Sequence, residues 1–457
     1  MCFIVSSFSK LAAILLAHIL IHMLIKINKL SIVRFLLYLT IISAFMGALI
    51  MSFEIGSIHL FPYRYMLFIM CLIFLSSIIV NNGRLYIANI KIKLYLKFLA
   101  FWLCYSFLSV MWAADKVEAF KNLIFLFTGI SMVFFIVYYF RDLRHLKWLY
   151  WLWLLIFVLF IFIGLWEVST GEHLSISGRF GDENIATKLS PTATFHNQND
   201  FALYIALTLP MVFVWIRYYP MLYSRAAGIL IYISGLLLLI VAFSRSCYSG
   251  VLVGLVFWFI FMLKIKNKIK VLALTALVCA ALFVFFSAEI LNILETATNR
   301  LASLSQIIGA QGIEDESLNT RMNLVKNALY FTVKSLGFGV GIGNVEYYMA
   351  NYPIYPVGDV TNVHNWWVEI LANYGVLIFA CYVILYINLL WNLWRVYKKT
   401  SNRSEKMICE SLLVGWVSFF IASSASSSII AFEPQWIYLG FILAFLNYSR
   451  INETALG

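Results

Sequence analysis

Long, uninterrupted runs of apolar residues decide what this chain can fold into. Within each run hydrophobic residues follow one another without the polar alternation of a half-buried strand. A bilayer core offers the backbone no water, so only helices and closed barrels can span it, and continuous runs favour helices. The predicted class is therefore all-α: a polytopic membrane helical bundle of about 12–13 transmembrane helices with a large extracytoplasmic loop.

Composition agrees with a fold whose solvent is lipid. Hydrophobic residues make up 63% of the chain and charged residues 12%, and the mean hydropathy is +0.89. These values lie outside the range of soluble domains. Allowing a few residues of error at each end, the predicted spans are 11–25, 32–53, 60–80, 96–113, 117–140, 147–167, 199–217, 226–243, 247–263, 270–288, 367–394, 407–427 and 432–449.

The first run, residues 11–25, is the weakest of these candidates. It offers about 15 residues where about 20 are needed to cross the hydrocarbon core. The run is either a full span or a half-inserted N-terminal helix. A cleaved signal peptide is the third possibility, although no small-residue cleavage site follows it.

Positive charge alternates between the predicted loops. One set of loops consists of every second loop, from residues 26–34 to the C-terminal tail. The loops of this set together hold 22 of the 33 lysines and arginines but only four of the 21 acidic residues. Because basic loops are retained on the cytoplasmic side, this set and the C-terminus are predicted to be cytoplasmic. The net charge of +12 is thus a topology signal, and no nucleic-acid partner is implied.

This topology sends the two longest polar segments, residues 168–198 and 289–366, to the face away from the cytoplasm. The second segment is too long for a simple turn and is expected to form short helices on the membrane surface. Function is expected on this outer face. We divide the chain into an N-terminal transmembrane bundle (1–288), the large extracytoplasmic loop (289–366) and C-terminal transmembrane helices (367–457).

The first candidate site is the polar run 194–200, which opens one of the spans. A helix start that faces water can bind anions through its free N–H groups and its dipole. His196, Asn197 and Asn199 are therefore candidates for substrate binding. The alternative is that Asn199 or Asp200 only caps the helix.

A second candidate is Ser244-Arg245-Ser246, a turn with almost no loop between two apolar spans. An arginine with so little loop in which to reach water is costly, so a phosphate or carboxylate partner explains Arg245 better than a structural origin. The third candidate is Asn319-Thr320-Arg321, directly before an amphipathic segment. Arg321 points either at the site or at lipid headgroups.

The fourth candidate is Val363-His364-Asn365-Trp366-Trp367, at the start of the next long span. A helix N-terminus disfavours a protonated imidazole, which leaves His364 as a neutral ring able to accept a proton. The alternative is an interfacial histidine beside a tryptophan belt.

Two other patterns carry no chemistry in our interpretation. The glycine run 337–343 lacks the strand–helix unit of a dinucleotide loop, and close packing or approach to a ligand explains its glycines better. The seven cysteines lie mostly inside apolar runs without paired spacing, so neither disulfides nor zinc is indicated. We expect no cofactor and no metal, because the one dense acidic cluster, residues 314–316, lies in the stretch of the loop expected to be most mobile.

Taken together, these motifs resemble the O-antigen ligase and polymerase superfamily of bacterial envelope glycan assembly. The resemblance covers roughly residues 170–450 and includes the late outer loop. Where members often carry Glu-x-Gly after the histidine, this sequence reads Asn373-Tyr374-Gly375, which puts a carboxylate role there in doubt. The span that begins Leu60-Phe61-Pro62-Tyr63-Arg64 is similar to the teichuronic acid and exopolysaccharide polymerase branch. The matching motifs are His196 to Asn199, Ser244 with Arg245, Arg321, the glycine run, and His364 with Asn365.

The resemblance implies an inverting, metal-independent glycosyltransferase in the bacterial cytoplasmic membrane. It would transfer an oligosaccharide from an undecaprenyl-diphosphate donor to an acceptor glycan hydroxyl on the outer face. Arg245 and Arg321 suit stabilisation of the departing diphosphate, with Arg179 in reserve, and His364 suits a general base. Asn365 joins His196, Asn197 and Asn199 as a substrate-binding candidate.

Two alternatives differ in acceptor or in function. An O-antigen-type ligase would use the same donor with another acceptor. A lipid-linked oligosaccharide flippase would also have a dozen spans, but transporters place ionisable residues near the bilayer midplane, where this sequence has few. The expected partners are the lipid-linked donor, the acceptor glycan, membrane lipids and other proteins of polysaccharide export.

Overall fold

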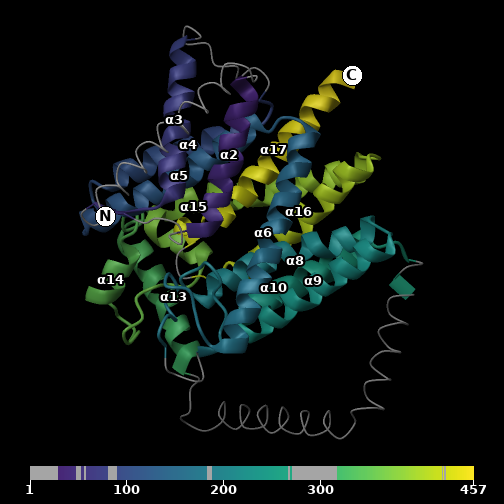
Figure 1. The fold of residues 1–457 in the computed structure, drawn as a ribbon. Coiled ribbons are helices and arrows are strands. Elements are labelled where there is room, and N and C mark those ends of the chain that lie inside the picture. Colours follow the sequence, from purple (N-terminus) through teal and green to yellow (C-terminus); the bar gives the residue numbers. More distant parts are fainter. Residues whose placement is uncertain are drawn as a thin grey trace, which may run out of the picture.

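The computed structural model describes residues 29–47, 53–55, 58–80, 90–182, 188–265, 268–269, 316–424, 426 and 429–456. Within these ranges the chain is almost entirely helical (Figure 1), which confirms the predicted all-α class. The helices before residue 220 are α2 (Lys29–Met46), α3 (Pro62–Val80), α4 (Lys93–Ser109), α5 (Lys116–Tyr139), α6 (Leu143–Thr170) and α8 (Gln198–Tyr218). Those after it are α9 (Leu222–Val241), α10 (Arg245–Phe257), the π-helix η3 (Trp258–Met262), α13 (Glu316–Lys334), α14 (Val345–Asn351), α15 (Trp366–Lys399), α16 (Arg403–Ala422), the 3₁₀ turn η4 (Ile429–Ala431) and α17 (Glu433–Leu456).

The predicted spans coincide with helices, apart from errors of a few residues at their ends. Among the described helices, seven are long and apolar enough to cross a membrane: α3, α5, α6, α8, α9, α10 continued by η3, and α15. Two boundaries are wrong. The span 32–53 runs past the end of α2 into a small antiparallel hairpin of β1 (Phe53–Ile55) and β2 (Ile58–Leu60), and the span 407–427 runs five residues past the end of α16. The expected spans 11–25 and 270–288 lie outside the described residues.

Side-chain caps fix where several helices begin. Each capping side chain accepts a hydrogen bond from a backbone N–H of the first turn, satisfying a donor that has no partner inside the helix. This explains why α5, α6, α8, α15 and α16 start where they do. Their caps are Asp115, Asp142, Asn197, Asn365 and Asn402.

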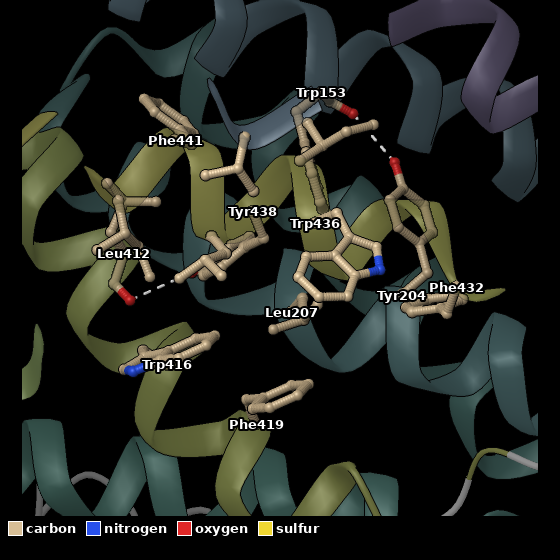
Figure 2. Close-up of a cluster of buried hydrophobic side chains, with 14 of the residues drawn as sticks. Trp153, Tyr204, Leu207, Leu412, Trp416, Phe419, Phe432, Trp436, Tyr438 and Phe441 are labelled. Atoms are coloured by element: carbon tan, nitrogen blue, oxygen red, sulfur yellow. Dashed lines mark hydrogen bonds between the residues drawn. The ribbon is translucent and has the colours of Figure 1, made fainter. Parts of the chain in front are cut away.

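The core lies where α8, α16 and α17 meet α5 and α6, and it is largely aromatic (Figure 2). Trp416 on α16 stacks on Tyr438 of α17, with ring centroids 6.3 Å apart. The buried hydroxyl groups find backbone partners: the Tyr204 hydroxyl donates to the Trp153 carbonyl over 3.1 Å and that of Tyr438 to the Leu412 carbonyl over 3.3 Å. Because protein rather than lipid surrounds α16 and α17, these helices can bury polar side chains.

The described helix ends beside the loops predicted to be cytoplasmic lie at one end of the bundle, which we call the basic end. There Arg34 at the start of α2 lies 3.5 Å from Asp142 before α6. Arg217 at the end of α8 pairs with Glu410 of α16, and Arg450 of α17 donates to Asn392 of α15 over 3.1 Å. The helix ends that the charge pattern groups together therefore lie together in the structure, while the side of the membrane that they face stays a prediction.

The helix ends that carry the candidate motifs meet at the other end, which we call the motif end. Here residues 316–363, with α13 and α14, pack against the start of α15 (Figure 1). The contact is formed around a small apolar core of their own. Because residues 289–315 lie outside the described part, the division of the chain at 288 and 366 stays a prediction.

The glycine run joins this unit to α15 by close backbone packing. Gly375 breaks the helical conformation of α15 with φ 80°, and the Val340 N–H donates to the Ala372 carbonyl over 2.8 Å at this kink. Gly339, also with φ 80°, could not carry a Cβ, since that atom would lie 2.6 Å from the Asn373 carbonyl oxygen. The glycines thus serve packing.

Candidate site at the motif end

A cavity of about 520 Å³ brings two of the predicted catalytic residues together. Arg321 and His364 both line it, although they are 43 positions apart in the sequence. The remaining wall comes from the first turns of α13 and the loop before His364: Thr320, Leu324, Val357, Gly358, Asp359 and Val360.

His364 lies in an unusual backbone conformation at the edge of this cavity. Its φ is +50°, in the left-handed region that a residue with a Cβ seldom adopts. Its N–H donates to the Asn362 side-chain oxygen over 2.9 Å. The next residue, Asn365, caps α15 by accepting from the N–H groups of Trp367 and Val368. Asn365 therefore has a structural function that accounts for its place in the motif.

Two asparagines on one face of α13 hold the cavity wall opposite His364. Asn323 donates to the Pro356 carbonyl over 2.9 Å. Asn327 donates to the Tyr355 carbonyl and accepts from the Ile354 N–H over 2.9 Å. These bonds fix the loop 353–357 against the helix that carries Arg321. The two asparagines were not predicted as site residues, although their spacing of four places both on one side of a helix and is visible in the sequence.

Arg245 lies at the motif end but does not line the cavity. It is the exposed first residue of α10, after a turn of only three residues. The thiol of Cys247, two residues further on, lies 3.8 Å from the Ala422 carbonyl at the end of α16. The N–H of Trp366, two residues after His364, donates to the next carbonyl, Ser423, over 3.2 Å.

The starts of α8, α10 and α15 therefore contact one short segment, residues 420–426. Its Ser426 hydroxyl donates to the Asp200 carboxylate in the first turn of α8. The sequence-based prediction missed this segment because it took residues 407–427 as one span. The serine-rich run 423–428 within an apolar stretch is the signal that marks it.

The polar run before α8 proves to be largely structural. Asn197 caps α8, accepting from the Asp200 N–H over 2.9 Å and donating to its carboxylate over 2.8 Å. The cap is thus Asn197 rather than Asn199 or Asp200. Asn199 is half-buried in the first turn, and His196 is exposed, with its ring beside Gly178.

Arg179 binds side chains of the polar segment that leads into α8. Its guanidinium donates to the Gln198 side-chain oxygen over 2.9 Å and forms an ion pair with Asp182 at 3.0 Å. Neither Arg179 nor His196 lines the cavity that holds His364 and Arg321. The predicted residues therefore fall into three groups along the motif end: the cavity, the start of α10, and the start of α8.

A fully buried carboxylate holds the segment that leads to α8. Glu167, near the end of α6, accepts from the N–H groups of Thr192 and Ala193, both over 2.8 Å. It also lies 3.1 Å from the ring of His173, whose other nitrogen contacts the Lys188 carbonyl. No local pattern in the sequence connects these residues, because they are 6 to 26 positions apart.

We expect Glu167→Ala to destabilise the protein by about 3–5 kcal/mol, because it leaves two buried N–H groups and a buried imidazole without their acceptor. Thermal unfolding in detergent measures the effect. The exposed neighbour Glu172 provides the control, since Glu172→Ala removes the same charge without a buried partner. Equal unfolding temperatures for the two variants would contradict the structural function of Glu167.

Within the described residues, no group of three or more histidine, cysteine or acidic side chains is arranged to hold a metal ion. Glu314 and Asp315 of the acidic cluster lie outside those residues. That the protein uses no cofactor and no metal therefore stays a prediction. The described part of the site consists of a histidine, an arginine and an aspartate around one cavity, with a second arginine at the nearby helix start.

Two comparisons relate this chain to known proteins. Residues 228–383 match the family model described as O-antigen ligase. This range contains Arg245, Arg321 and His364, but not Arg179 or His196. The chain is also 29% identical over 418 residues to the "Teichuronic acid biosynthesis protein TuaE" of Bacillus subtilis (strain 168), covering 91% of this chain and 84% of that protein.

The predicted resemblance to the O-antigen ligase and polymerase superfamily is thereby confirmed, including the likeness to its teichuronic acid branch. Together with the apolar helices, these matches support a multi-pass membrane enzyme of polysaccharide biosynthesis.

Proposed function

We propose that this protein transfers an oligosaccharide from an undecaprenyl-diphosphate donor to an acceptor glycan hydroxyl on the extracytoplasmic face of the bacterial cytoplasmic membrane. The observation that carries the proposal is the cavity in which His364 and Arg321 meet. A proton acceptor and a cation are the two groups that such a transfer requires, because the acceptor loses a proton while the leaving group gains negative charge.

In the proposed reaction the acceptor hydroxyl oxygen attacks the anomeric carbon of the donor sugar, and the imidazole of His364 takes the hydroxyl proton. The bond from the anomeric carbon to the diphosphate oxygen breaks, and its electron pair leaves with the polyprenyl diphosphate. A single displacement of this kind inverts the anomeric centre. Arg321 stabilises the charge on the departing diphosphate, and Asp359 in the cavity wall can accept hydrogen bonds from sugar hydroxyls.

Arg245 is the second proposed diphosphate contact. It begins α10, whose start meets the same segment, residues 420–426, as the start of α15. A guanidinium forms two parallel hydrogen bonds to a phosphate, which an ammonium cannot reproduce. The start of α8, with His196, Asn199 and Arg179, is in our proposal a surface for the glycan part of a substrate rather than for the chemistry.

The distribution of charge argues against a transporter. In the described spanning helices every Asp, Glu, Lys and Arg lies within about two turns of a helix end. Transporters place ionisable residues near the bilayer midplane, where they bind the substrate or the coupling ion. Bond formation at a surface suits this pattern better than passage through the bundle.

Because the Bacillus subtilis relative is named for teichuronic acid biosynthesis, we propose polymerisation rather than transfer to a different acceptor. In that case the acceptor is a growing glycan of the same repeat, and a ligase would differ only in what it accepts. Deleting the gene tests the proposal in cells. We expect the lipid-linked repeat to accumulate while the long polymer disappears, and a normal polymer pattern after deletion would contradict the proposed function.

Arg245→Lys should strongly impair polymer formation, by about 10²–10³ fold, because the change keeps the charge but removes the forked contact. Polymer output from membranes with matched protein levels measures it. Arg225→Lys, at the basic end of the neighbouring helix α9, is the matched control and should retain activity. Full output from Arg245→Lys would remove the bidentate contact from the proposal.

Residues 316–365 should face away from the cytoplasm. A cysteine introduced at the exposed Asn351, in a variant whose native cysteines are replaced by alanine, should react with an impermeant maleimide in intact cells. A cysteine at Lys399, at the basic end, should react only after permeabilisation. The reverse pattern would overturn the topology and with it the proposed active face.

A further inference from the structure

A chain of two hydrogen bonds joins His364 to a carboxylate outside the cavity wall. The His364 N–H donates to the Asn362 side-chain oxygen over 2.9 Å. The amide nitrogen of Asn362 donates to the Glu346 carboxylate over 2.6 Å. Glu346 itself lies in the first turn of α14, a helix that starts where the Val345 N–H donates to the Asn373 side chain over 3.0 Å.

Helix α14, which carries Glu346, is held in place on two sides. Asn373 belongs to α15, so α14 is tied to the same helix that His364 precedes. Asn344, just before α14, accepts from the Asp115 N–H over 2.6 Å and donates to the Asp115 carbonyl over 3.1 Å at the start of α5. The Glu346 carboxylate is therefore a rigidly held acceptor for the loop that contains His364.

We propose that Glu346 and Asn362 are a positioning pair, which holds His364 in its left-handed backbone conformation and so sets the direction of its imidazole in the cavity. A residue with a Cβ adopts φ near +50° only where its surroundings enforce it. The inference rests on the proposed function, because it assigns the pair a role in base catalysis by His364. Neither residue lines the cavity, so the pair acts through His364 alone.

The directions of the two hydrogen bonds explain why residue 362 is an asparagine. An ionised carboxylate only accepts hydrogen bonds, so the Asn362 amide nitrogen must face Glu346, and its oxygen is left for the His364 N–H. Aspartate at 362 could still accept from His364 but would set two carboxylates against each other. Glutamine at 346 would restore a donor, so the bond between residues 346 and 362 would form again with its direction reversed, while the His364 N–H would still donate to residue 362.

The surroundings of Glu346 make this repulsion severe. Burial raises its pKa, and Glu118 on α5 raises it further, while the hydrogen bond from Asn362 lowers it. Glu369 on α15 also lies near Glu346, and Glu118 itself pairs with Lys121. In Asn362→Asp the two carboxylates would therefore hold one proton between them at low pH and lose it as the pH rises.

The test compares Asn362→Asp, Glu346→Gln and the double variant, using lipid-linked repeat extracted from cells that lack the gene. We expect Asn362→Asp to lower kcat about 10–100-fold with KM for the donor unchanged, because the base is misplaced while the donor still binds. Glu346→Gln alone should stay near normal, since its amide oxygen can accept from Asn362. The double variant should recover most of the lost kcat. Asn351→Asp, at the exposed end of α14, is the matched control and should have no effect.

The pH profile separates positioning from general stability. Relative to the unmodified protein, the activity of Asn362→Asp should rise as the pH falls, because a shared proton rebuilds the bond between the two carboxyl groups. Normal kcat in Asn362→Asp would overturn the proposal. If this variant fails to accumulate in membranes, recovery of protein but not of kcat in the double variant would also overturn it.

His364→Ala, measured alongside, distinguishes this proposal from the proposed function. If His364→Ala is inactive and Asn362→Asp is normal, only the positioning pair is wrong. If His364→Ala is fully active, base catalysis by His364 is wrong, and the positioning proposal falls with it.

Discussion

His364→Ala should lower turnover by about 10²–10⁴ fold while the protein still inserts into the membrane and binds its donor. The reason is that a general base acts on the proton of the acceptor and makes no essential contact with the lipid diphosphate. Turnover and donor affinity, measured on the purified protein with lipid-linked donor, give the two parts of this result. A parallel loss of both would instead indicate that His364 holds the donor.

His364→Gln separates chemistry from structure in the same assay. Glutamine has a similar size and can form a hydrogen bond, but it cannot accept a proton near neutral pH. If His364 only anchored the start of α15, this variant would retain most of its activity. We expect it to be nearly as inactive as His364→Ala, and near-normal turnover would refute the assignment as base.

Arg321→Ala should lower kcat by about 10²–10³ fold, because the departing diphosphate loses a cation in the cavity where its charge develops. The effect should be larger on kcat than on KM, since that charge grows as the bond breaks. Steady-state kinetics with purified donor measure both quantities.

Lys334→Ala is the matched control for Arg321→Ala. It removes one positive charge from the same helix, α13, but at its far end, outside the cavity. If both variants lose activity equally, Arg321 acts through the overall charge of the outer surface, for example on lipid headgroups. If neither does, the cavity is not where the diphosphate leaves.

The spans were predictable because each is encoded locally. Apolar runs place α5 and α15 to within a few residues, and the charge pattern sorts helix ends such as those carrying Arg34 and Arg450. The errors arise where a run of apolar and small residues does not continue as a helix. The serines after Ala422 are small enough to pass as part of a span, although the Ser426 hydroxyl bonds to the start of another helix.

The site was predictable only in part, because motif residues act in two ways that the sequence does not separate. His364 and Arg321 meet in one cavity, as the role that we propose for them requires. Asn197 and Asn365, from equally polar motifs, are occupied as caps. Glu167 and the pair of Glu346 and Asn362 depend on partners far apart in the sequence, which no local spacing reveals.

The central claim is that the cavity of His364 and Arg321 is where a new glycosidic bond forms and the polyprenyl diphosphate is released. Purified protein in liposomes, supplied with lipid-linked repeat extracted from cells that lack the gene, tests it most directly. We predict that one free polyprenyl diphosphate forms for each new glycosidic bond, and that His364→Ala abolishes both products. Movement of intact lipid-linked repeat across the liposome membrane, with no new glycosidic bond and no free polyprenyl diphosphate, would contradict the account and identify a transporter.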